Sequence, residues 1–143
     1  MTTPDSAPLR QILLVEDSLS DIEITLEALA EASVASNVVV VRDGDAALEH
    51  LRAPRVSHPH LVILDLNLPR LSGHEVLAAM RADPELRMIP VVVLTTSAAE
   101  SDVLKTYDLG ANCFLTKPFG VDQFIDVVRS IDGSWLNLAR LPR

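Results

Sequence analysis

Five side chains that could bind a metal ion and a phosphoryl group stand at or near the ends of short aliphatic runs in this sequence. They are Glu16, Asp17, Asp65, Thr95 and Lys117. Three carboxylates brought together repel one another unless a cation neutralises them, and hard oxygen ligands without Cys or His favour Mg²⁺ over zinc. A hydroxyl and an ammonium opposite the carboxylates can donate hydrogen bonds to the oxygens of an incoming phosphoryl group. These residue types therefore predict Mg²⁺-dependent phosphoryl chemistry, provided that the fold brings them together.

The aliphatic runs predict five short strands. They cover residues 11–16, 38–43, 61–66, 91–95 and 113–117. Val, Leu and Ile follow one another in them almost without interruption, which is typical of strands that are buried on both faces of a parallel sheet. The hydrophobic fraction is 48% while aromatic residues make up only 3% of the chain. The core must therefore be built from these aliphatic side chains.

The segments between the runs carry the signals of helices. Three Ser–Glu pairs have the spacing of a capping box, in which a hydroxyl and a carboxylate satisfy the first backbone amides of a helix: Ser20 with Glu23, Ser72 with Glu75, and Ser97 with Glu100. Two apolar stripes have the spacing of core-facing helices: Ile22, Leu26 and Leu29, and then Val121, Phe124, Ile125 and Val128. Strict alternation of strands and helices predicts an α/β fold, a (βα)5 doubly wound parallel five-stranded sheet.

This fold predicts where the chemistry lies. Doubly wound sheets bind ligands at the carboxyl ends of their strands, beside a switch in strand order. The five chemically active side chains all stand at such strand ends. We therefore expect them to meet at one edge of the sheet.

The acidic balance of the chain argues against several classes of function. A net charge of −8 would repel a phosphate backbone, so we expect no direct contact with nucleic acid. The longest apolar runs, such as residues 12–15 and 91–94, are far shorter than the roughly 18 residues of a membrane span, and residues 1–8 lack the pattern of a secretion signal. Cys113 is the single cysteine and fits a reducing cytosol. We therefore expect a cytoplasmic protein with no membrane contact.

Four motifs on the predicted strand ends resemble those of the response-regulator receiver domains of two-component signalling. They are Val15-Glu16-Asp17, then Leu64-Asp65-Leu66-Asn67-Leu68-Pro69 followed by Ser72-Gly73, then Val93-Leu94-Thr95-Thr96, and finally Lys117-Pro118-Phe119. The likeness covers residues 11 to about 131, and the four motifs in this order are far more specific than any one alone. It implies a flavodoxin-like receiver fold and a phosphorylation switch that a partner histidine kinase supplies.

The resemblance also implies roles for individual acidic residues. Asp65 would be the phosphoacceptor, and Asp17, Asp65 and the backbone carbonyl of Asn67 would bind Mg²⁺ with Glu16 assisting. The family often has Asp where this chain has Glu16, a difference that keeps the charge. Asn67 and Ser97 would help to set the rate at which water hydrolyses the acyl phosphate. The protein would then be a phosphoacceptor that discharges itself, and no turnover enzyme.

Other roles implied by the resemblance concern the response to phosphorylation. Thr95 and Lys117 would hold the phosphoryl oxygens. Phe114 occupies the aromatic switch position, where the ring moves inward as the threonine is drawn to the phosphate, although a Phe at this place could equally be plain core. The bond between Lys117 and Pro118 resembles the family's cis peptide.

The last residues of the chain resemble those of one subgroup of receivers. Residues 132–143 are similar to the ending of small stand-alone receivers that partner bacterial phytochromes and often dimerise. Four apolar residues of this tail are candidates for an interface: Trp135, Leu136, Leu138 and Leu141. The sequence thus predicts a tail over residues 1–10, a receiver over 11–131 and an apolar tail over 132–143. Its expected partners are a sensor histidine kinase, in particular a bacteriophytochrome, a second copy of the chain and a histidine phosphotransfer protein, although Trp135 could instead fold back onto its own domain.

Three rival functions fit the residues less well. A phosphatase with an aspartyl-phosphate intermediate would resemble an Asp-x-Asp pattern, whereas this chain has Asp65-Leu66-Asn67, and we expect no cap domain. A pseudo-receiver that is never phosphorylated would be expected to lose some of the acidic, threonine or lysine positions, and all are present. A dinucleotide-binding domain would need Gly-x-Gly-x-x-Gly after the first strand, which this sequence lacks.

Overall fold

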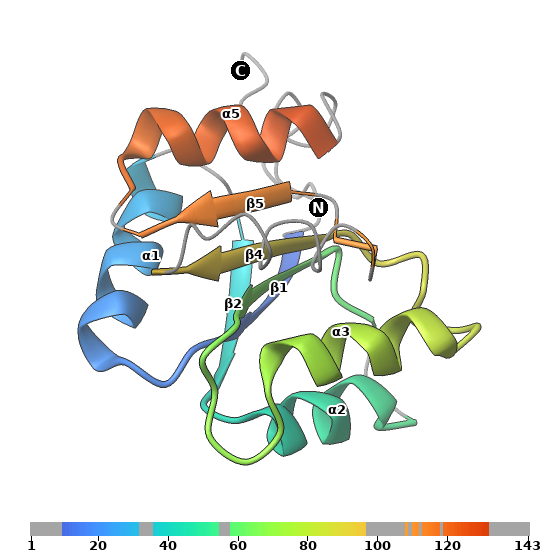
Figure 1. Ribbon diagram of the computed structural model, residues 1–143. Coiled ribbons are helices and arrows are strands. Elements are labelled where there is room, and N and C mark those ends of the chain that lie inside the picture. The colour runs from blue at the N-terminus through green and yellow to red at the C-terminus, as the bar shows by residue number, and fades with distance from the viewer. Residues whose placement is uncertain are drawn as a thin grey trace, which may run out of the picture.

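The computed structural model describes residues 10–31, 36–54, 58–96, 108, 110–111, 113–117 and 119–131, and over residues 10–95 strands and helices alternate as predicted. Most of the helix expected between the fourth and fifth strands lies outside the described residues. The described elements, labelled as in Figure 1, are β1 (Arg10–Val15), α1 (Leu19–Glu31), β2 (Ser36–Val41), α2 (Gly44–Arg52), β3 (Leu61–Asp65), α3 (Gly73–Ala82), β4 (Val91–Thr95), β5 (Cys113–Thr116) and α5 (Val121–Ile131). All five strands expected from the aliphatic runs are present.

The five strands form one parallel sheet in the order β2-β1-β3-β4-β5. The chain first adds β2 on one side of β1 and then builds outward on the other side, so the direction of winding reverses between β1 and β3. Ligands of doubly wound sheets bind beside this reversal, at the carboxyl ends of the strands. The predicted α/β fold is therefore confirmed. The strand order places the expected ligand site at the edge of the sheet where β1, β3 and β4 end with Val15, Asp65 and Thr95.

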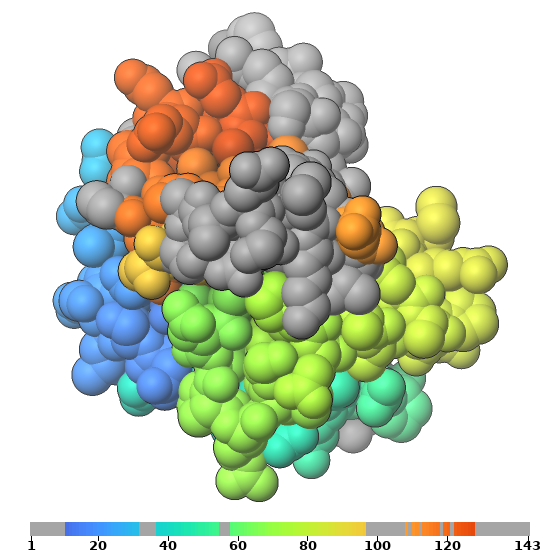
Figure 2. All heavy atoms as spheres, viewed as in Figure 1, coloured from blue at the N-terminus to red at the C-terminus, as the bar shows by residue number. Residues whose placement is uncertain are grey.

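Helices cover both faces of the sheet (Figure 1). Ile12 and Leu14 of β1 point to one face, where they pack with residues of α1 and α5. Leu13 and Val15 point to the other face and pack with residues of α2 and α3. Figure 2 shows the same orientation with side chains filled in, with α1 in blue, α5 in orange-red and α3 in green.

Burial on both faces is confirmed only for the central strands. The aliphatic side chains of β1, β3 and β4 are at most 1% exposed. Strand β2 lies at the edge of the sheet, and its Val39 is 38% exposed. The prediction was wrong for β2 and also for β5, whose Cys113 and Phe114 are only half-buried. Both are edge strands, which lie at the rim of the helix layers, although the Val-rich sequence of β2 resembles that of a central strand. None of the helices among the described residues is long and apolar enough to cross a bilayer.

The predicted helix starts have different outcomes. At α3, Ser72 Oγ accepts a hydrogen bond from the amide of Glu75 at 3.2 Å, and the Glu75 carboxylate accepts one from the Ser72 amide at 3.0 Å, which confirms the capping box. At α1 the expected cap was wrong. The helix begins at Leu19, so Ser20 lies inside it, and the hydroxyl of Ser18 accepts the hydrogen bond of the Asp21 amide at 3.3 Å. The third pair, Ser97 with Glu100, lies outside the described residues.

The apolar stripe of α1 is rotated from the one that the sequence predicted. Ile22 and Leu29 are buried as expected, but Leu26 is 37% exposed, and Thr25 and Ala28 take its place on the buried face. The Thr25 side chain can lie there because its hydroxyl donates a hydrogen bond to the carbonyl of Asp21 at 2.9 Å, which satisfies the buried polar atom.

Helix α5 presents the predicted apolar face as far as its side chains are described. Phe124 is fully buried, and Ile125 packs at the margin of the core that α1 and α5 share. The Phe124 ring also stacks with that of Phe119, with ring centroids 6.1 Å apart. The side chains of Val121 and Val128 lie outside the described residues. These contacts place Phe119, two residues after Lys117, against the body of the domain.

Candidate functional site

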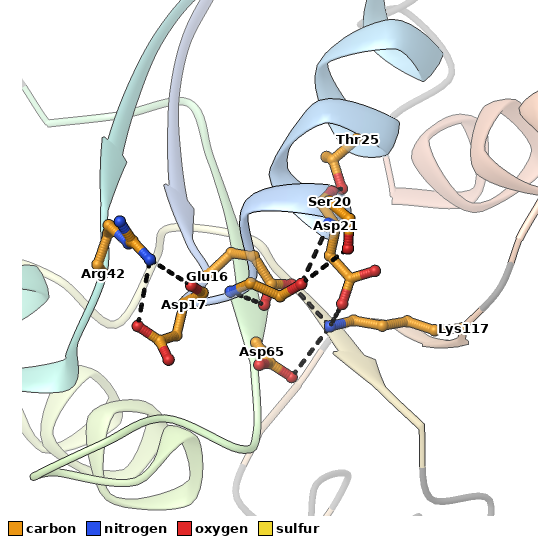
Figure 3. Close-up of polar contacts among 9 residues, drawn as sticks. Glu16, Asp17, Ser20, Asp21, Thr25, Arg42, Asp65 and Lys117 are labelled. Atoms are coloured by element: carbon orange, nitrogen blue, oxygen red, sulfur yellow. Dashed lines mark hydrogen bonds and ion pairs between the residues drawn. The ribbon is translucent and has the colours of Figure 1, made fainter.

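The ammonium of Lys117, which follows β5, meets side chains from the ends of β1 and β3 (Figure 3). Its Nζ donates a hydrogen bond to Oε1 of Glu16 at 2.7 Å and lies 3.5 Å from Oδ1 of Asp65. Backbone hydrogen bonds fix these strand ends, because the Lys117 amide donates to the carbonyl of Thr95 and the Glu16 amide to that of Val41. The parallel register therefore brings together residues that are up to 101 positions apart in sequence.

These charges are buried. The side chain of Lys117 is 9% exposed, that of Asp65 5% and that of Glu16 1%. Charged groups at such depth are costly unless they are paired. Burial alone would lower the pKa of Lys117, but the hydrogen bonds that it donates to Asp21 and Glu16 and the negative charges of Asp65 and Glu16 outweigh this effect, so the pKa is raised. Lys117 is thus a permanent cation that neutralises part of an acidic pocket.

Asp21 is a member of this cluster that the sequence did not reveal. Its Oδ2 accepts a hydrogen bond from Lys117 Nζ at 2.8 Å, and its side chain is 30% exposed. The residue stands in the first turn of α1, shortly after the acidic pair Glu16-Asp17 that follows β1. The motifs on the strand ends include no residue of this helix, so Asp21 was not among the predicted site residues.

Asp65 lacks a full set of partners. Its Oδ1 is buried and accepts no hydrogen bond from the residues that the structure describes. Burial and the negative charge of Glu16 raise the pKa of Asp65 to about 6, although Lys117 and the backbone amide of Asn67 act in the opposite direction. This carboxylate therefore sits in a position that is short of positive charge.

Asp17 does not join the cluster as the sequence predicted. Its carboxylate Oδ1 lies 3.7 Å from the guanidinium of Arg42, and its side chain is 52% exposed. In Figure 3 it points toward Arg42 and away from Lys117. Within the part of the chain that the structure describes, no three Asp, Glu, His or Cys side chains are grouped so as to hold a metal ion as they stand.

The residues nevertheless fit a hard divalent cation. Glu16, Asp17 and Asp65 offer only carboxylate oxygens, the ligand type that Mg²⁺ prefers. The buried Oδ1 of Asp65 has an unused acceptor position, and its raised pKa indicates that an additional positive charge would be favourable. Both the donor type and the state of the Asp65 carboxylate therefore fit a hard divalent cation.

The remaining predicted site residues are placed as follows. Thr95 ends β4, is 1% exposed and pairs in register with Thr116. Asn67 is exposed, two residues after Asp65. Phe114 is half-buried and packs against the core that α2 and α3 share. Six further candidates lie outside the described residues: Ser97, Pro118, Trp135, Leu136, Leu138 and Leu141.

A glycine shapes the turn beside Asp65. The amide of Gly73 donates a hydrogen bond to the carbonyl of Leu66 at 3.1 Å, which brings the start of α3 against the end of β3. A Cβ atom at Gly73 would collide with the carbonyl of Asp65 and lie 2.7 Å from the Cα of Leu66. The predicted Ser72-Gly73 motif thus combines a helix cap with a close backbone approach to the site.

The sequence profile of the response regulator receiver domain matches residues 12–129 of this chain. The chain belongs to the response regulator receiver family. Among relatives of this receiver, the response regulator Rcp1 of Synechocystis sp. is 41% identical over an alignment of 145 positions, which covers 96% of this chain and 97% of Rcp1. The Mn²⁺-bound form of Rcp1 has a TM-score of 0.76 at 40% identity, over 94% of this chain and 99% of the other.

Two further solved structures are similar to this receiver. The phosphorylated cyanobacterial phytochrome response regulator RcpA has a TM-score of 0.77 at 44% identity, over 95% of this chain and 100% of RcpA. The bacteriophytochrome response regulator RtBRR has a TM-score of 0.80 at 44% identity, over 87% of this chain and 79% of RtBRR. The family and the receiver fold that the sequence motifs predicted are therefore confirmed.

Proposed function

We propose that Asp65 accepts a phosphoryl group from a sensor histidine kinase and that the resulting change of shape passes the signal on through protein contacts. The observation that carries this proposal is the ammonium of Lys117, which is buried between Glu16 and Asp65 at the carboxyl edge of the sheet. Membership of the receiver family supports it.

The transfer needs little covalent chemistry from the protein. An oxygen of Asp65 attacks phosphorus in line, and the bond from phosphorus to the imidazole nitrogen of the kinase breaks as the new P–O bond forms. Lys117 and the hydroxyl of Thr95 donate hydrogen bonds to the phosphoryl oxygens. For this, Lys117 exchanges one of its present carboxylate partners for a phosphoryl oxygen. The product is an acyl phosphate that water hydrolyses, with Asn67 and Ser97 tuning the rate.

A divalent cation, for which we propose Mg²⁺, completes the site. Glu16, Asp17, Asp65 and the backbone carbonyl of Asn67 would hold it. When bound, it supplies positive charge that offsets the charge on the transferring phosphoryl group. The all-oxygen donor set and the unused acceptor position of Asp65 support this assignment, as does the existence of a Mn²⁺-bound form of Rcp1.

Phosphorylation would act on a two-state domain. It adds about two negative charges at neutral pH to a site that is already acidic. Thr95 would move toward the new phosphoryl group, and Phe114 would follow into the space behind it. Phe114 is half-buried against the α2/α3 core, so a modest motion would change how much of the ring a partner meets.

The partner proposal rests on the relatives. RcpA is a phytochrome response regulator and RtBRR a bacteriophytochrome response regulator. We therefore propose a bacteriophytochrome kinase as the phosphodonor of this chain, in the cytoplasm. A homodimer through the tail residues Trp135, Leu136, Leu138 and Leu141, and onward transfer to a histidine phosphotransfer protein, are the routes proposed for the signal to leave.

Acetyl phosphate tests the central step without the kinase. The full chain is incubated with acetyl phosphate and Mg²⁺, and intact mass is measured for the wild type, for Asp65→Asn and for Asp126→Asn, a control at an exposed position of α5. We expect one acid-labile phosphoryl adduct on the wild type and the control, and none on Asp65→Asn. An unmodified wild type would instead place the chain among pseudo-receivers.

A further inference from the structure

Arg42 holds Asp17 on the side of the site away from Lys117. It follows β2, whose last residue, Val41, pairs in register with Val15 at the end of β1. The guanidinium donates a hydrogen bond to the backbone carbonyl of Asp17 at 2.7 Å and lies 3.7 Å from the Asp17 carboxylate. Figure 3 shows the two side chains facing each other. The neighbouring strands thus fix Arg42 where it meets both the backbone and the side chain of Asp17.

The two cations of the site divide the acidic residues between them. Lys117 contacts Glu16, Asp21 and Asp65, while Arg42 contacts Asp17. The guanidinium of Arg42 is positively charged and attracts the carboxylate of Asp17. Asp17 therefore already has a positive partner before any metal ion approaches.

The exposure of this pair determines how strong its effect is. The side chains of Arg42 and Asp17 are 51% and 52% exposed, so water screens their attraction and the carboxylate can leave the guanidinium at small cost. The pair is therefore too weak to close the site, but strong enough to alter a binding equilibrium that needs the same carboxylate.

We propose that Arg42 is a positioning residue that competes with the divalent cation for Asp17 and so sets how tightly the unphosphorylated receiver binds Mg²⁺. This inference rests on the proposed function, because it takes Asp17 as one of the cation's ligands. A receiver with a neutral side chain at position 42 would present Asp17 without a competing charge and bind Mg²⁺ more tightly.

Calorimetric titration of Mg²⁺ into the full unphosphorylated chain measures this effect directly. Arg42→Ala should bind Mg²⁺ about 2- to 5-fold more tightly than the wild type, the range that an exposed ion pair supports. The matched control is Arg52→Ala, which removes the same charge from an exposed position at the end of α2. Arg52→Ala changes only the net charge of the protein, so its increase in Mg²⁺ affinity should be smaller than that of Arg42→Ala.

A second background separates competition for Asp17 from other effects. In Asp17→Asn the carboxylate is absent, so adding Arg42→Ala should give no more gain than adding Arg52→Ala. Arg42→Gln, which keeps a long side chain, replaces Arg42→Ala if the latter lowers the unfolding temperature in metal-free buffer. The proposal would be overturned if Arg42→Ala still raised the Mg²⁺ affinity more than Arg52→Ala in the Asp17→Asn background. It would also be overturned if Arg42→Ala and Arg52→Ala raised the affinity of the otherwise wild-type chain equally, or if Arg42→Ala lowered it.

The failure of this inference can be told from the failure of the proposed function. If the wild type binds Mg²⁺ and Asp65 is phosphorylated, but Arg42→Ala binds no more tightly, only the competition is disproved. If Asp65 stays unmodified by acetyl phosphate, the proposed function itself fails, whatever the titrations show.

Discussion

Lys117 lies closer to Asp21 of α1 than to the proposed phosphoacceptor. The distance from its Nζ to Oδ2 of Asp21 is 2.8 Å, and that to Oδ1 of Asp65 is 3.5 Å. A helix that the sequence motifs leave out of the site therefore holds the lysine in the unphosphorylated state. To meet a phosphoryl oxygen, the ammonium has to weaken a contact with Asp21 or Glu16.

Removing the charge of Asp21 should therefore make phosphorylation easier. In Asp21→Asn the competing acceptor for Lys117 is weaker by about 1 kcal/mol, the size of one charge-assisted hydrogen bond, so the rate of Asp65 phosphorylation by acetyl phosphate should rise about 3- to 6-fold. Intact mass against time measures the rate. Glu27→Gln removes a charge from an exposed position of the same helix and is the control. A slower reaction would mean that Asp21 orients Lys117 for transfer.

The raised pKa of Asp65 makes the stability of the metal-free protein depend on pH. The group has a pKa of about 6 in the folded protein against an ordinary value of 3.8, so the folded state binds more protons between these values. Stability then falls as the pH rises from about 4 to about 6, because the buried carboxyl has to give up its proton. Relative to Asp65→Asn, the wild type should lose about 1–3 kcal/mol of unfolding free energy over this window.

Urea unfolding at a series of pH values, with a chelator present, measures that difference. Repeating the series with Mg²⁺ should flatten it, because a bound cation favours the ionised carboxylate. Parallel stability profiles for the wild type and Asp65→Asn in chelator would contradict the assignment of the raised pKa to this group.

The close approach at Gly73 predicts a local loss of stability on substitution. Gly73→Ala places a Cβ atom against the carbonyl of Asp65 and the Cα of Leu66, both backbone atoms that cannot rotate away. We expect a loss of about 1–3 kcal/mol in urea unfolding. Gly120→Ala is the matched control because a Cβ there has no neighbour within 4 Å, and its effect should stay below about 1 kcal/mol. If Gly73→Ala lost no more unfolding free energy than Gly120→Ala, α3 would be able to shift and accommodate the added Cβ atom.

The tail proposal has a separate test. Truncation after Ile131 removes Trp135, Leu136, Leu138 and Leu141. If these residues form a dimer interface, the sedimentation mass should fall from that of two copies to that of one, while the urea midpoint of the receiver stays close to that of the full chain. An unchanged mass would remove the tail from the interface, and a lower midpoint with unchanged mass would favour packing of Trp135 on its own domain.

The sequence could predict the parts of the fold that hydrophobic runs define. The residues of β4 match the prediction, since the strand is wholly aliphatic up to Thr95. Strand β2 lies two residues earlier than predicted, because Ser36 and Asn37 pair with β1 through their backbones although their side chains are polar. Hydrophobicity reports burial and not pairing, so an edge strand with a polar start escapes it.

The candidate site was predicted where strand ends alone determine it. Glu16, Asp65 and Lys117 meet because parallel register dictates it. The contact of Lys117 with Asp21 depends on where α1 begins, and that of Asp17 with Arg42 depends on which strand borders β1. The motifs contain information on neither the helix start nor the strand order. The ion pairs of Lys117 with Asp21 and of Arg42 with Asp17 could therefore be found only in the three-dimensional structure.

The strand order arranges charge along the rim of the sheet in a simple sequence. Arg42 follows one outermost strand and Lys117 the other, while Glu16, Asp17 and Asp65 stand between them. One cation at each margin of the sheet thus offsets part of the repulsion among the acidic residues that stand between them. If, as we propose, a divalent cation takes Asp17 from Arg42, its binding would release a charged side chain at the margin of the sheet beside β2.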